Sequence, residues 1–209
     1  AEDTDRAIRS VTDSPAFVDG RFVATGSFHE VELAAGFDAL SLALVRAAEL
    51  AGQRVHRLLD GRFSGLPDQL SPDPGPNTGL IVVQKRVVGV LNELRRLAAP
   101  ASVGLAETSL GQEDAMTFAF EAAEKLRRVE GLVRDVVACE LLVARQASAL
   151  RGGPVAAGLE PVSRRLAGLV EPVEADRPLG TDLTLLVAVL ERGGMAAFDK
   201  ADERTERPA

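Results

Sequence analysis

Hydrophobic residues recur at helical spacing along most of the chain, and this pattern predicts its main elements. From about residue 32 to residue 60, apolar positions repeat every three to four residues over more than one face, which is typical of a helix inside a bundle. The same periodicity predicts helices over about 78–98, 112–151, 155–170 and 181–192. We therefore expect an all-α protein built around long helices.

A short β-hairpin is predicted before the first long helix. Asp19 and Gly20 stand between the β-prone stretches 16–18 and 21–24. A two-residue turn of type I′ needs positive φ at both central positions, and Asp-Gly is one of the strongest sequence signals for it. Residues 1–11 are short and polar, and we expect them to be the end of a truncated helix.

Residues that favour turns separate the predicted helices. The loop 61–77 is rich in Gly, Pro, Asp and Ser, and its length suggests functional or interfacial use. Asn77 precedes the second helix and is suited to cap it, because its side chain can accept a hydrogen bond from a backbone amide. These boundaries predict five segments: 1–11 as a truncated helix end, 12–31 as hairpin and loop, 32–151 as a long-helix bundle core, 152–198 as short C-terminal helices, and 199–209 as a disordered tail.

The predicted helix over 112–151 is too long for a compact chain of this size. At about 1.5 Å per residue it would span about 60 Å. A globule of 209 residues has a radius of gyration of about 17 Å. Its stretch 136–144 is also apolar all round apart from Glu140. This combination predicts an oligomer, or a partner segment that covers the helix.

The composition narrows the chemistry that the chain can perform. It contains no Tyr, no Trp, one Cys and two His. Tyrosine therefore cannot act as base, acid or nucleophile here. A disulfide framework needs a cysteine pair, and a structural zinc site needs about four Cys or His ligands, so neither is expected.

Charge and hydropathy narrow the choice of partners and compartment. The net charge of −7 argues against nucleic acid or an anionic membrane as partner. We expect no signal peptide at the polar, acidic N-terminus, and no membrane span, because uninterrupted apolar runs of about 18 residues are missing. The single cysteine fits a reducing cytoplasm, where we expect the protein to act.

Five short motifs follow one another along the chain. They are Thr12-Asp13-Ser14-Pro15, Ser27-Phe28-His29, Asn77-Thr78-Gly79-Leu80, Pro100-Ala101-Ser102-Val103, and Thr108-Ser109 with Gln112-Glu113-Asp114. Each is weak alone, but their order and spacing resemble the C-terminal part of histidine and phenylalanine ammonia-lyases. The family patterns are T/S-D-N-P, G-N-F-H, N-S-G-L/F-M, H-P-x-S-V and T-S-x-x-Q-E-D. With Asp176-Arg177-Pro178-Leu179, the resemblance runs over nearly all of residues 5–195.

The resemblance implies an all-α, long-helix bundle of the ammonia-lyase (fumarase/aspartase-like) type with a short N-terminal β-hairpin. It also implies a tetramer-like assembly with active sites built from more than one subunit. Family enzymes make an electrophilic methylidene-imidazolone from an internal Ala-Ser-Gly triad. These 209 residues contain no Ala-Ser-Gly sequence, and Ala24-Thr25-Gly26 is only superficially similar to one. The family's catalytic tyrosines and carboxylate-binding arginine lie upstream of the matched region.

By the same resemblance, Glu113 is the expected catalytic residue, and it would contact the substrate side chain or ammonium group. Phe28, Asn77 and Gln112 are expected to bind the substrate. Simpler roles stay open: an acid in the first turn of a helix is stabilised by the helix dipole, Phe28 can be a core aromatic, and Asn77 can be a cap. We expect no metal ligands, a surface position for His56 and a core position for Cys139.

Departures from the family pattern keep two functions open. Ser14, Ser27 and Ala115 replace an Asn, an Asn and a His of the family. The first function is the C-terminal subunit or portion of a two-part ammonia-lyase or aminomutase, inactive alone, acting on an aromatic or histidine-like amino acid. Its partner would be an N-terminal lyase half carrying the Ala-Ser-Gly triad and the methylidene-imidazolone, in a homo- or hetero-oligomer. The second is a non-catalytic helical scaffold or regulatory homologue.

Overall fold

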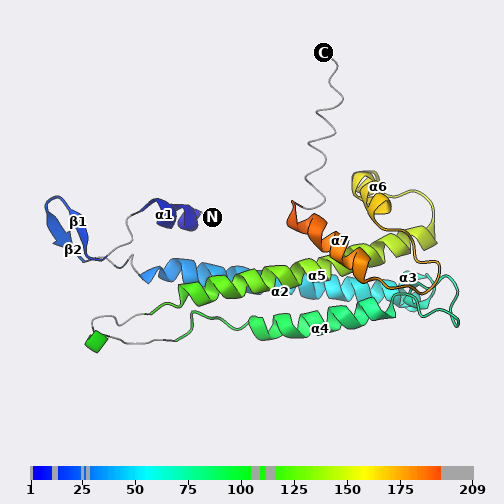
Figure 1. Ribbon diagram of the computed structural model, residues 1–209, viewed down its shortest axis with the longest axis horizontal. Coiled ribbons are helices and arrows are strands. Elements are labelled where there is room, and N and C mark those ends of the chain that lie inside the picture. Colours follow the sequence, from blue (N-terminus) through cyan, green and yellow to red (C-terminus); the bar gives the residue numbers. More distant parts are fainter. Residues whose placement is uncertain are drawn as a thin grey trace, which may run out of the picture. The chain divides into compact units, whose positions relative to one another are not determined.

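The computed structural model describes residues 2–10, 14–24, 26, 29–104, 109–111 and 116–193. These residues are mostly helical, with a single two-stranded sheet among them (Figure 1). The elements are α1 (Glu2–Arg9), β1 (Ala16–Val18), β2 (Arg21–Val23), α2 (Val31–Leu59), α3 (Gly61–Ser64), η2 (Asp68–Leu70), α4 (Ile81–Leu97), η3 (Ser109–Gly111), α5 (Ala119–Arg151), η4 (Ala157–Leu159), α6 (Glu160–Leu169) and α7 (Gly180–Glu191). The expected all-α class is confirmed.

The predicted hairpin is present. β1 pairs with β2 in antiparallel register, with Phe17 opposite Phe22. Asp19 and Gly20 have φ values of 49° and 78°, as a type I′ turn requires. The two phenylalanine rings lie 5.1 Å apart, within the range of a favourable aromatic pair.

The chain divides into two compact units. The first comprises residues 1–46 and 94–131, and the second comprises residues 47–93 and 132–209. The long helices α2, α4 and α5 each contribute residues to both units. In the first unit, small and branched apolar residues of these helices are buried: Ala34, Val45, Leu94, Ala122 and Val129.

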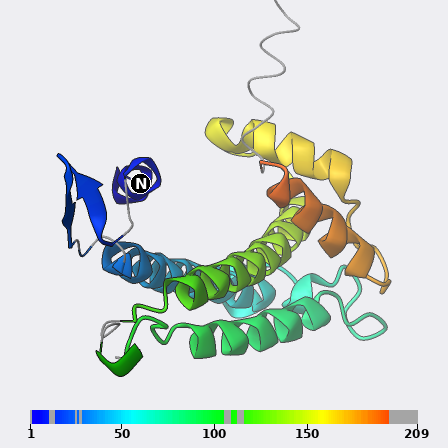
Figure 2. The ribbon, with the colours of Figure 1, turned by 60° about the vertical axis from the view of Figure 1, so that its left-hand side comes forward.

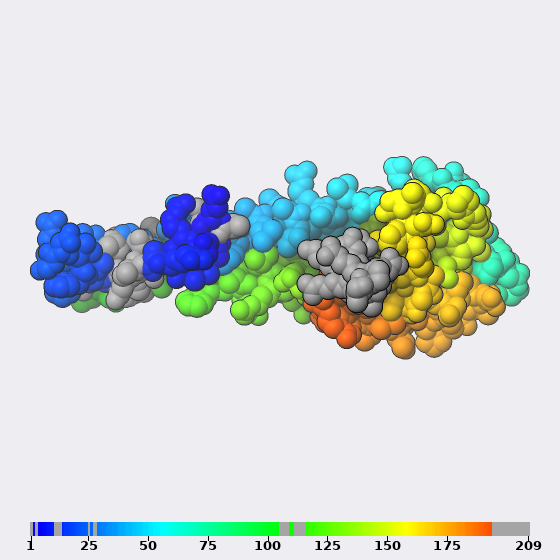
Figure 3. All heavy atoms as spheres, turned by 90° about the horizontal axis from the view of Figure 1, so that it is seen from above, coloured from blue at the N-terminus to red at the C-terminus, as the bar shows by residue number. Residues whose placement is uncertain are grey.

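The core of the second unit combines apolar packing with one buried amide. A side chain on Gly52 would place its Cβ 2.5 Å from Leu91 Cδ1, so α2 and α4 approach closely there. Gln146 of α5 is buried, donates to the carbonyl oxygens of Leu70 and Val173, and accepts from the Val173 amide. One side chain thereby satisfies backbone groups of two loops. Helix α7 lies along the C-terminal part of α5 (Figure 2), and α6 lies at the surface of this unit (Figure 3).

Several predicted boundaries needed correction. The first long helix ends at Leu59, close to the expected Asp60. The second starts at Ile81, not near Thr78, and the loop before it contains α3 and η2. The longest starts at Ala119, not at Gln112, because residues 116–118 are not helical and Phe118 has a φ of 53°.

The helices of the described residues also bear on membrane insertion. None of them combines the length and the apolar character that crossing a membrane requires.

Candidate functional site

Only one of the four predicted site residues can be placed. Phe28, Gln112 and Glu113 lie outside the described residues, whereas Asn77 is described and half-buried. Two places are therefore described separately: Asn77 with the polar groups near it in the second unit, and, in the first unit, a buried charge that contacts another of the predicted motifs.

Asn77 joins two loops of the second unit that are far apart in sequence. Its Oδ1 accepts a 2.9 Å hydrogen bond from the backbone amide of Asp176. The Asp176 carboxylate accepts in return from the amide and hydroxyl of Thr78, at 2.9 and 2.8 Å, and from the Gly79 amide at 3.0 Å. The Thr78 amide, followed by the other donors, holds the pKa of Asp176 below its ordinary value. These hydrogen bonds join the motifs 77–80 and 176–179 in both directions, and we call this set of contacts between Asn77, Thr78, Gly79 and Asp176 the clamp.

The predicted capping role of Asn77 is wrong. Helix α4 begins at Ile81, about one turn later, and the Asn77 side chain reaches Asp176 instead of a helix amide. The carboxylate of Asp176 accepts hydrogen bonds from the backbone amides of Thr78 and Gly79, just before the helix. A residue from a distant loop therefore satisfies donors for which the local sequence suggested Asn77.

Gly79 has a backbone conformation that this clamp requires. Its φ is 61°, and a Cβ there would lie 2.5 Å from the Gln69 carbonyl oxygen. The next amide, of Leu80, donates to that same oxygen at 2.8 Å. The glycine of the Asn-x-Gly motif is thus required for both backbone angle and space.

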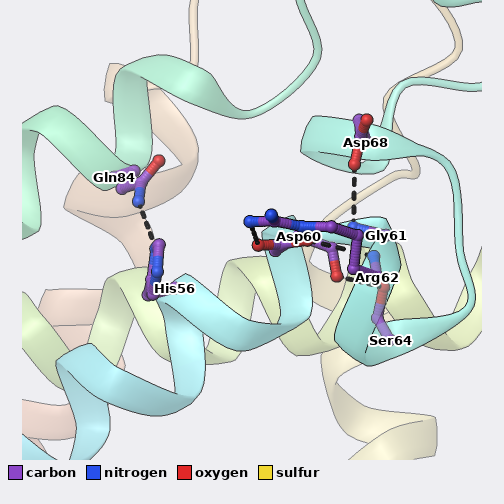
Figure 4. Close-up of polar contacts among 7 residues, drawn as sticks. All are labelled: His56, Asp60, Gly61, Arg62, Ser64, Asp68 and Gln84. Atoms are coloured by element: carbon purple, nitrogen blue, oxygen red, sulfur yellow. Dashed lines mark hydrogen bonds and ion pairs between the residues drawn. The ribbon is translucent and has the colours of Figure 1, made fainter.

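Gln69 also lines a pocket of about 300 Å³ in the second unit. His56, Asp60, Arg62, Asp68 and Gln84 line it as well (Figure 4). The Gln84 side-chain nitrogen lies 2.7 Å from His56 Nδ1. This distance is that of a hydrogen bond between the two side chains. His56 is exposed on α2, as expected.

The two carboxylates that line this pocket, Asp60 and Asp68, accept hydrogen bonds from backbone amides of residues 61 and 62. Asp60 accepts from the Arg62 guanidinium at 2.6 Å and from the Arg62 amide, and the guanidinium bond lowers the pKa of Asp60 to about 2. Asp68 accepts from the Gly61 amide at 2.8 Å (Figure 4). Among the described residues, no group of three or more His, Cys, Asp or Glu side chains could hold a metal ion. The arrangement suits a structural or binding role better than a reaction centre.

A buried ion pair holds another predicted motif in the first unit. Asp38 of α2 accepts hydrogen bonds from the amides of Ala101 and Ser102, from the Ser102 hydroxyl and from Lys125 of α5. Lys125 also donates to the Ala99 carbonyl at 2.7 Å. Burial alone would raise the pKa of Asp38, but the hydrogen bonds from Lys125, Ser102 and the two amides outweigh it and lower the pKa below its ordinary value. Asp38 thus fixes the loop of the Pro-x-Ser-Val motif.

The contacts of Asp38 with Lys125 and the role of Asp176 were not predicted from the sequence. A signal existed for Asp38, since it interrupts the buried face of an apolar helix, and a carboxylate there needs partners. Cys139 behaves as predicted: it is buried, and burial raises the pKa of its thiol to about 12.

Comparisons with known proteins connect these motifs to a family. A family model described as aromatic amino acid lyase matches residues 1–171. A histidine ammonia-lyase of Anaeromyxobacter sp. (strain K) is 35% identical over 198 residues, which cover 91% of this chain and 38% of that protein.

Solved structures agree with the sequence matches. The histidine ammonia-lyase of Trypanosoma cruzi superposes with a TM-score of 0.83 at 28% identity, covering 88% of this chain and 37% of that one. Pantoea agglomerans phenylalanine aminomutase superposes with a TM-score of 0.86 at 25% identity, covering 90% and 38%. The expected ammonia-lyase type of fold is confirmed.

The extent of these matches limits what they establish. The chain spans about two fifths of the length of the relatives that it matches. The family match takes in the N-terminal part of the chain and leaves out residues 172–209. It does not confirm the narrower expectation that the chain corresponds to the C-terminal part of such a protein.

Proposed function

We propose a function from one premise: the chain belongs to the aromatic amino acid lyase family. The chain forms part of a composite active site of an ammonia-lyase or aminomutase. A complementary lyase segment, outside these 209 residues, completes that site within a tetramer-like oligomer. The substrate class is an aromatic or histidine-like amino acid.

The contrast between two coverages carries this proposal. The histidine ammonia-lyase of Anaeromyxobacter aligns with 91% of this chain, but the alignment covers only 38% of that enzyme. The larger share of the enzyme therefore has no counterpart in this sequence. These 209 residues would therefore supply one part of such a site, and the remainder of the site would lie outside them.

The catalytic groups that these residues lack support the same assignment of the active site to two segments. The 209 residues include no Tyr and no Ala-Ser-Gly triad. This chain therefore does not form the methylidene-imidazolone that the family resemblance implies, and the proposal assigns that group to the complementary segment. The tyrosine base is assigned to the same segment.

The proposed reaction is redox-neutral. A base of the complementary segment takes a proton from the β-carbon, and that C–H electron pair forms the Cα=Cβ double bond. The C–N bond breaks, and its electron pair leaves with ammonia. In an aminomutase, the ammonia would add back at the β-carbon, and the base would return its proton to the α-carbon.

This chain would bind and orient the substrate for those steps. Glu113 would accept hydrogen bonds from the substrate ammonium or a polar ring, Phe28 would pack against the ring, and Gln112 would bind a polar group. The Oδ1 of Asn77 already accepts from the Asp176 amide, and its side-chain nitrogen would donate to a substrate acceptor. The Asp38 contacts hold Ala101 and Ser102, in the motif that precedes these positions in the sequence.

Reconstitution tests the proposal. The chain and the lyase segment encoded nearest to it are purified separately, mixed and followed by ammonia release and product absorbance with histidine, phenylalanine and tyrosine. Native mass spectrometry of the same samples reports the complex. The proposal expects a complex, with ammonia released by the mixture and by neither component alone.

A second candidate is a non-catalytic scaffold or regulatory homologue of the lyase. The replacement of family Asn, Asn and His residues by Ser14, Ser27 and Ala115 favours it. It predicts a stable complex whose ammonia release equals that of the complementary segment alone. The reconstitution assay distinguishes this result from the first candidate.

A further inference from the structure

The pocket at the C-terminal end of α2 contains a polar group that has no hydrogen-bond partner in the described residues. The Gln69 side chain lines this pocket, and its Oε1 is buried and accepts no hydrogen bond. A buried amide oxygen without a donor costs free energy, because it has lost its hydration without gaining a hydrogen bond. Such an acceptor in a native fold indicates that a donor from outside the chain binds there.

The backbone at Gln69 is held in an uncommon conformation. Gln69 and Leu70 have φ values of 55° and 54°, in the left-handed region that residues other than glycine seldom adopt. The hydrogen bond from the Leu80 amide to the Gln69 carbonyl oxygen helps to hold this conformation. Strained backbone of this kind clusters at ligand-binding sites. The last torsion of a glutamine side chain is soft, so a small rotation would bring Oε1 to a donor bound in the pocket.

The charges that line the pocket favour a cation. Asp60, Asp68 and Arg62 are its charged residues, so the lining carries one net negative charge while His56 is neutral. The Asp60 side chain is only 12% exposed, and both of its oxygens already accept from Arg62. Asp68 is exposed, its Oδ1 accepts from the Gly61 amide, and its Oδ2 accepts no hydrogen bond from the described residues. Asp68 therefore has an oxygen available for a cationic donor.

Close packing at Gly61 fixes the position of the Asp68 carboxylate. A Cβ on Gly61 would lie 2.6 Å from the Leu66 carbonyl oxygen and 2.9 Å from Asp68 Oδ1. The loop therefore approaches the start of α3 more closely than any residue larger than glycine would allow, and the Gly61 amide donates to Oδ1 at 2.8 Å (Figure 4). Because the carboxylate is held before a ligand arrives, less conformational entropy is lost when the ligand binds.

We propose that this pocket binds a small organic amine in its ammonium form. One N–H group of the ammonium would donate to Asp68 Oδ2 and another to Gln69 Oε1, while the hydrocarbon part would lie against Leu59, the apolar residue of the lining. The volume of about 300 Å³ equals that of about ten water molecules, which suits an amine of about that many non-hydrogen atoms. The site uses none of the residues assigned to substrate binding or catalysis, so it does not depend on the proposed function. Ordered water is the competing occupant.

Nuclear magnetic resonance of the purified full chain tests this binding, with n-butylammonium chloride as the probe. The probe should shift the side-chain amide signals of Gln69 and Gln84 until they saturate, with a dissociation constant on the order of 1 mM. Gln53 is exposed on α2 and does not line the pocket, so its signals should not shift. Tetramethylammonium carries the charge without an N–H group, and n-butanol has the chain without the charge. Each should bind at least about tenfold more weakly than n-butylammonium.

Two substitutions remove the proposed ligand contacts one at a time. Gln69→Met keeps the length of the side chain but removes the acceptor, and Asp68→Asn removes the charge but keeps an acceptor for the Gly61 amide. Each should raise the dissociation constant of n-butylammonium by at least about tenfold. Because Gln69 Oε1 has no partner in the free chain, Gln69→Met should not lower the urea midpoint. The controls Gln53→Met and Asp73→Asn change exposed residues of the same unit outside the pocket and should bind the probe as the wild type does.

Three results would overturn the proposal. The first is the absence of saturable shifts with n-butylammonium, which would leave ordered water as the occupant. The second is equal affinity for tetramethylammonium or n-butanol, since neither has both the charge and the N–H donors. The third is an unchanged dissociation constant in both Gln69→Met and Asp68→Asn. The ligand comparison uses the wild-type chain alone, so it remains decisive even if a variant fails to fold.

Discussion

Asp38 and Lys125 form a largely buried ion pair, with side chains only 8% and 11% exposed. The Asp38 charge is tolerated in such a place because its carboxylate accepts from two backbone amides and a hydroxyl as well as from Lys125. At the scale of single residues, this pair is what fixes the loop after α4.

Removing the charge of Asp38 should destabilise the fold strongly. Asp38→Asn leaves Lys125 buried without its counter-ion, so the free energy of unfolding should fall by about 3 kcal/mol in urea denaturation. The control is Asp135→Asn, which breaks the more exposed pair with Arg86 and should cost less than about 1 kcal/mol. Equal losses in the two variants would argue against the positioning role.

The lowered pKa of Asp38 also predicts an acid dependence of stability. A carboxyl whose pKa is lower in the folded state stabilises the fold above its unfolded pKa, near 3.8. That contribution is lost as the pH falls through the lower folded value. Urea midpoints of the wild type should therefore drop between about pH 5 and pH 2, and Asp38→Asn should show a shallower drop.

At the scale of elements, the turn before α4 depends on contacts that its own sequence does not contain. Asp176 supplies acceptors to Thr78 and Gly79, and Gln69 supplies the acceptor for Leu80. The start of α4 is therefore set by two other loops of the second unit.

This turn should be sensitive to a methyl group at Gly79. In Gly79→Ala, the alanine would have to adopt an unfavourable positive φ, and its methyl group would clash with the Gln69 carbonyl oxygen. The substitution should therefore lower the free energy of unfolding by about 3 kcal/mol. Gly65 has a similar φ of 70° but open space around it. Gly65→Ala should therefore cost about 1 kcal/mol, and the difference measures the close approach.

Local signals predicted some elements well, and long-range contacts decided the others. Asp19-Gly20 was sufficient for the hairpin, because turn geometry depends on those two residues. The start of α2 and its end near Asp60 also followed from periodicity. Asn77 was misjudged because its partner, Asp176, lies in a distant loop.

At the scale of the whole molecule, the 209 residues include no Tyr and no Ala-Ser-Gly triad. By itself, this composition excludes a tyrosine base and a methylidene-imidazolone formed from these residues. Beside membership of the lyase family and a match to 38% of a relative, it supports a division of catalytic groups between this chain and a complementary segment.

Within a reconstituted assembly, Glu113→Gln should impair turnover without affecting assembly. Loss of a carboxylate that contacts substrate should lower kcat/KM by about 100-fold. Glu160→Gln, at an exposed position of α6, should have no effect. Native mass spectrometry checks that both variants still form the complex; a normal kcat/KM for Glu113→Gln would remove it from the site.

The composite site is tested most directly by ammonia release from histidine, phenylalanine and tyrosine in three samples: this chain, the complementary segment, and their mixture. We expect release by the mixture alone, together with a complex that contains both components. Ammonia release by this chain alone, or a stable complex that releases none, would contradict it.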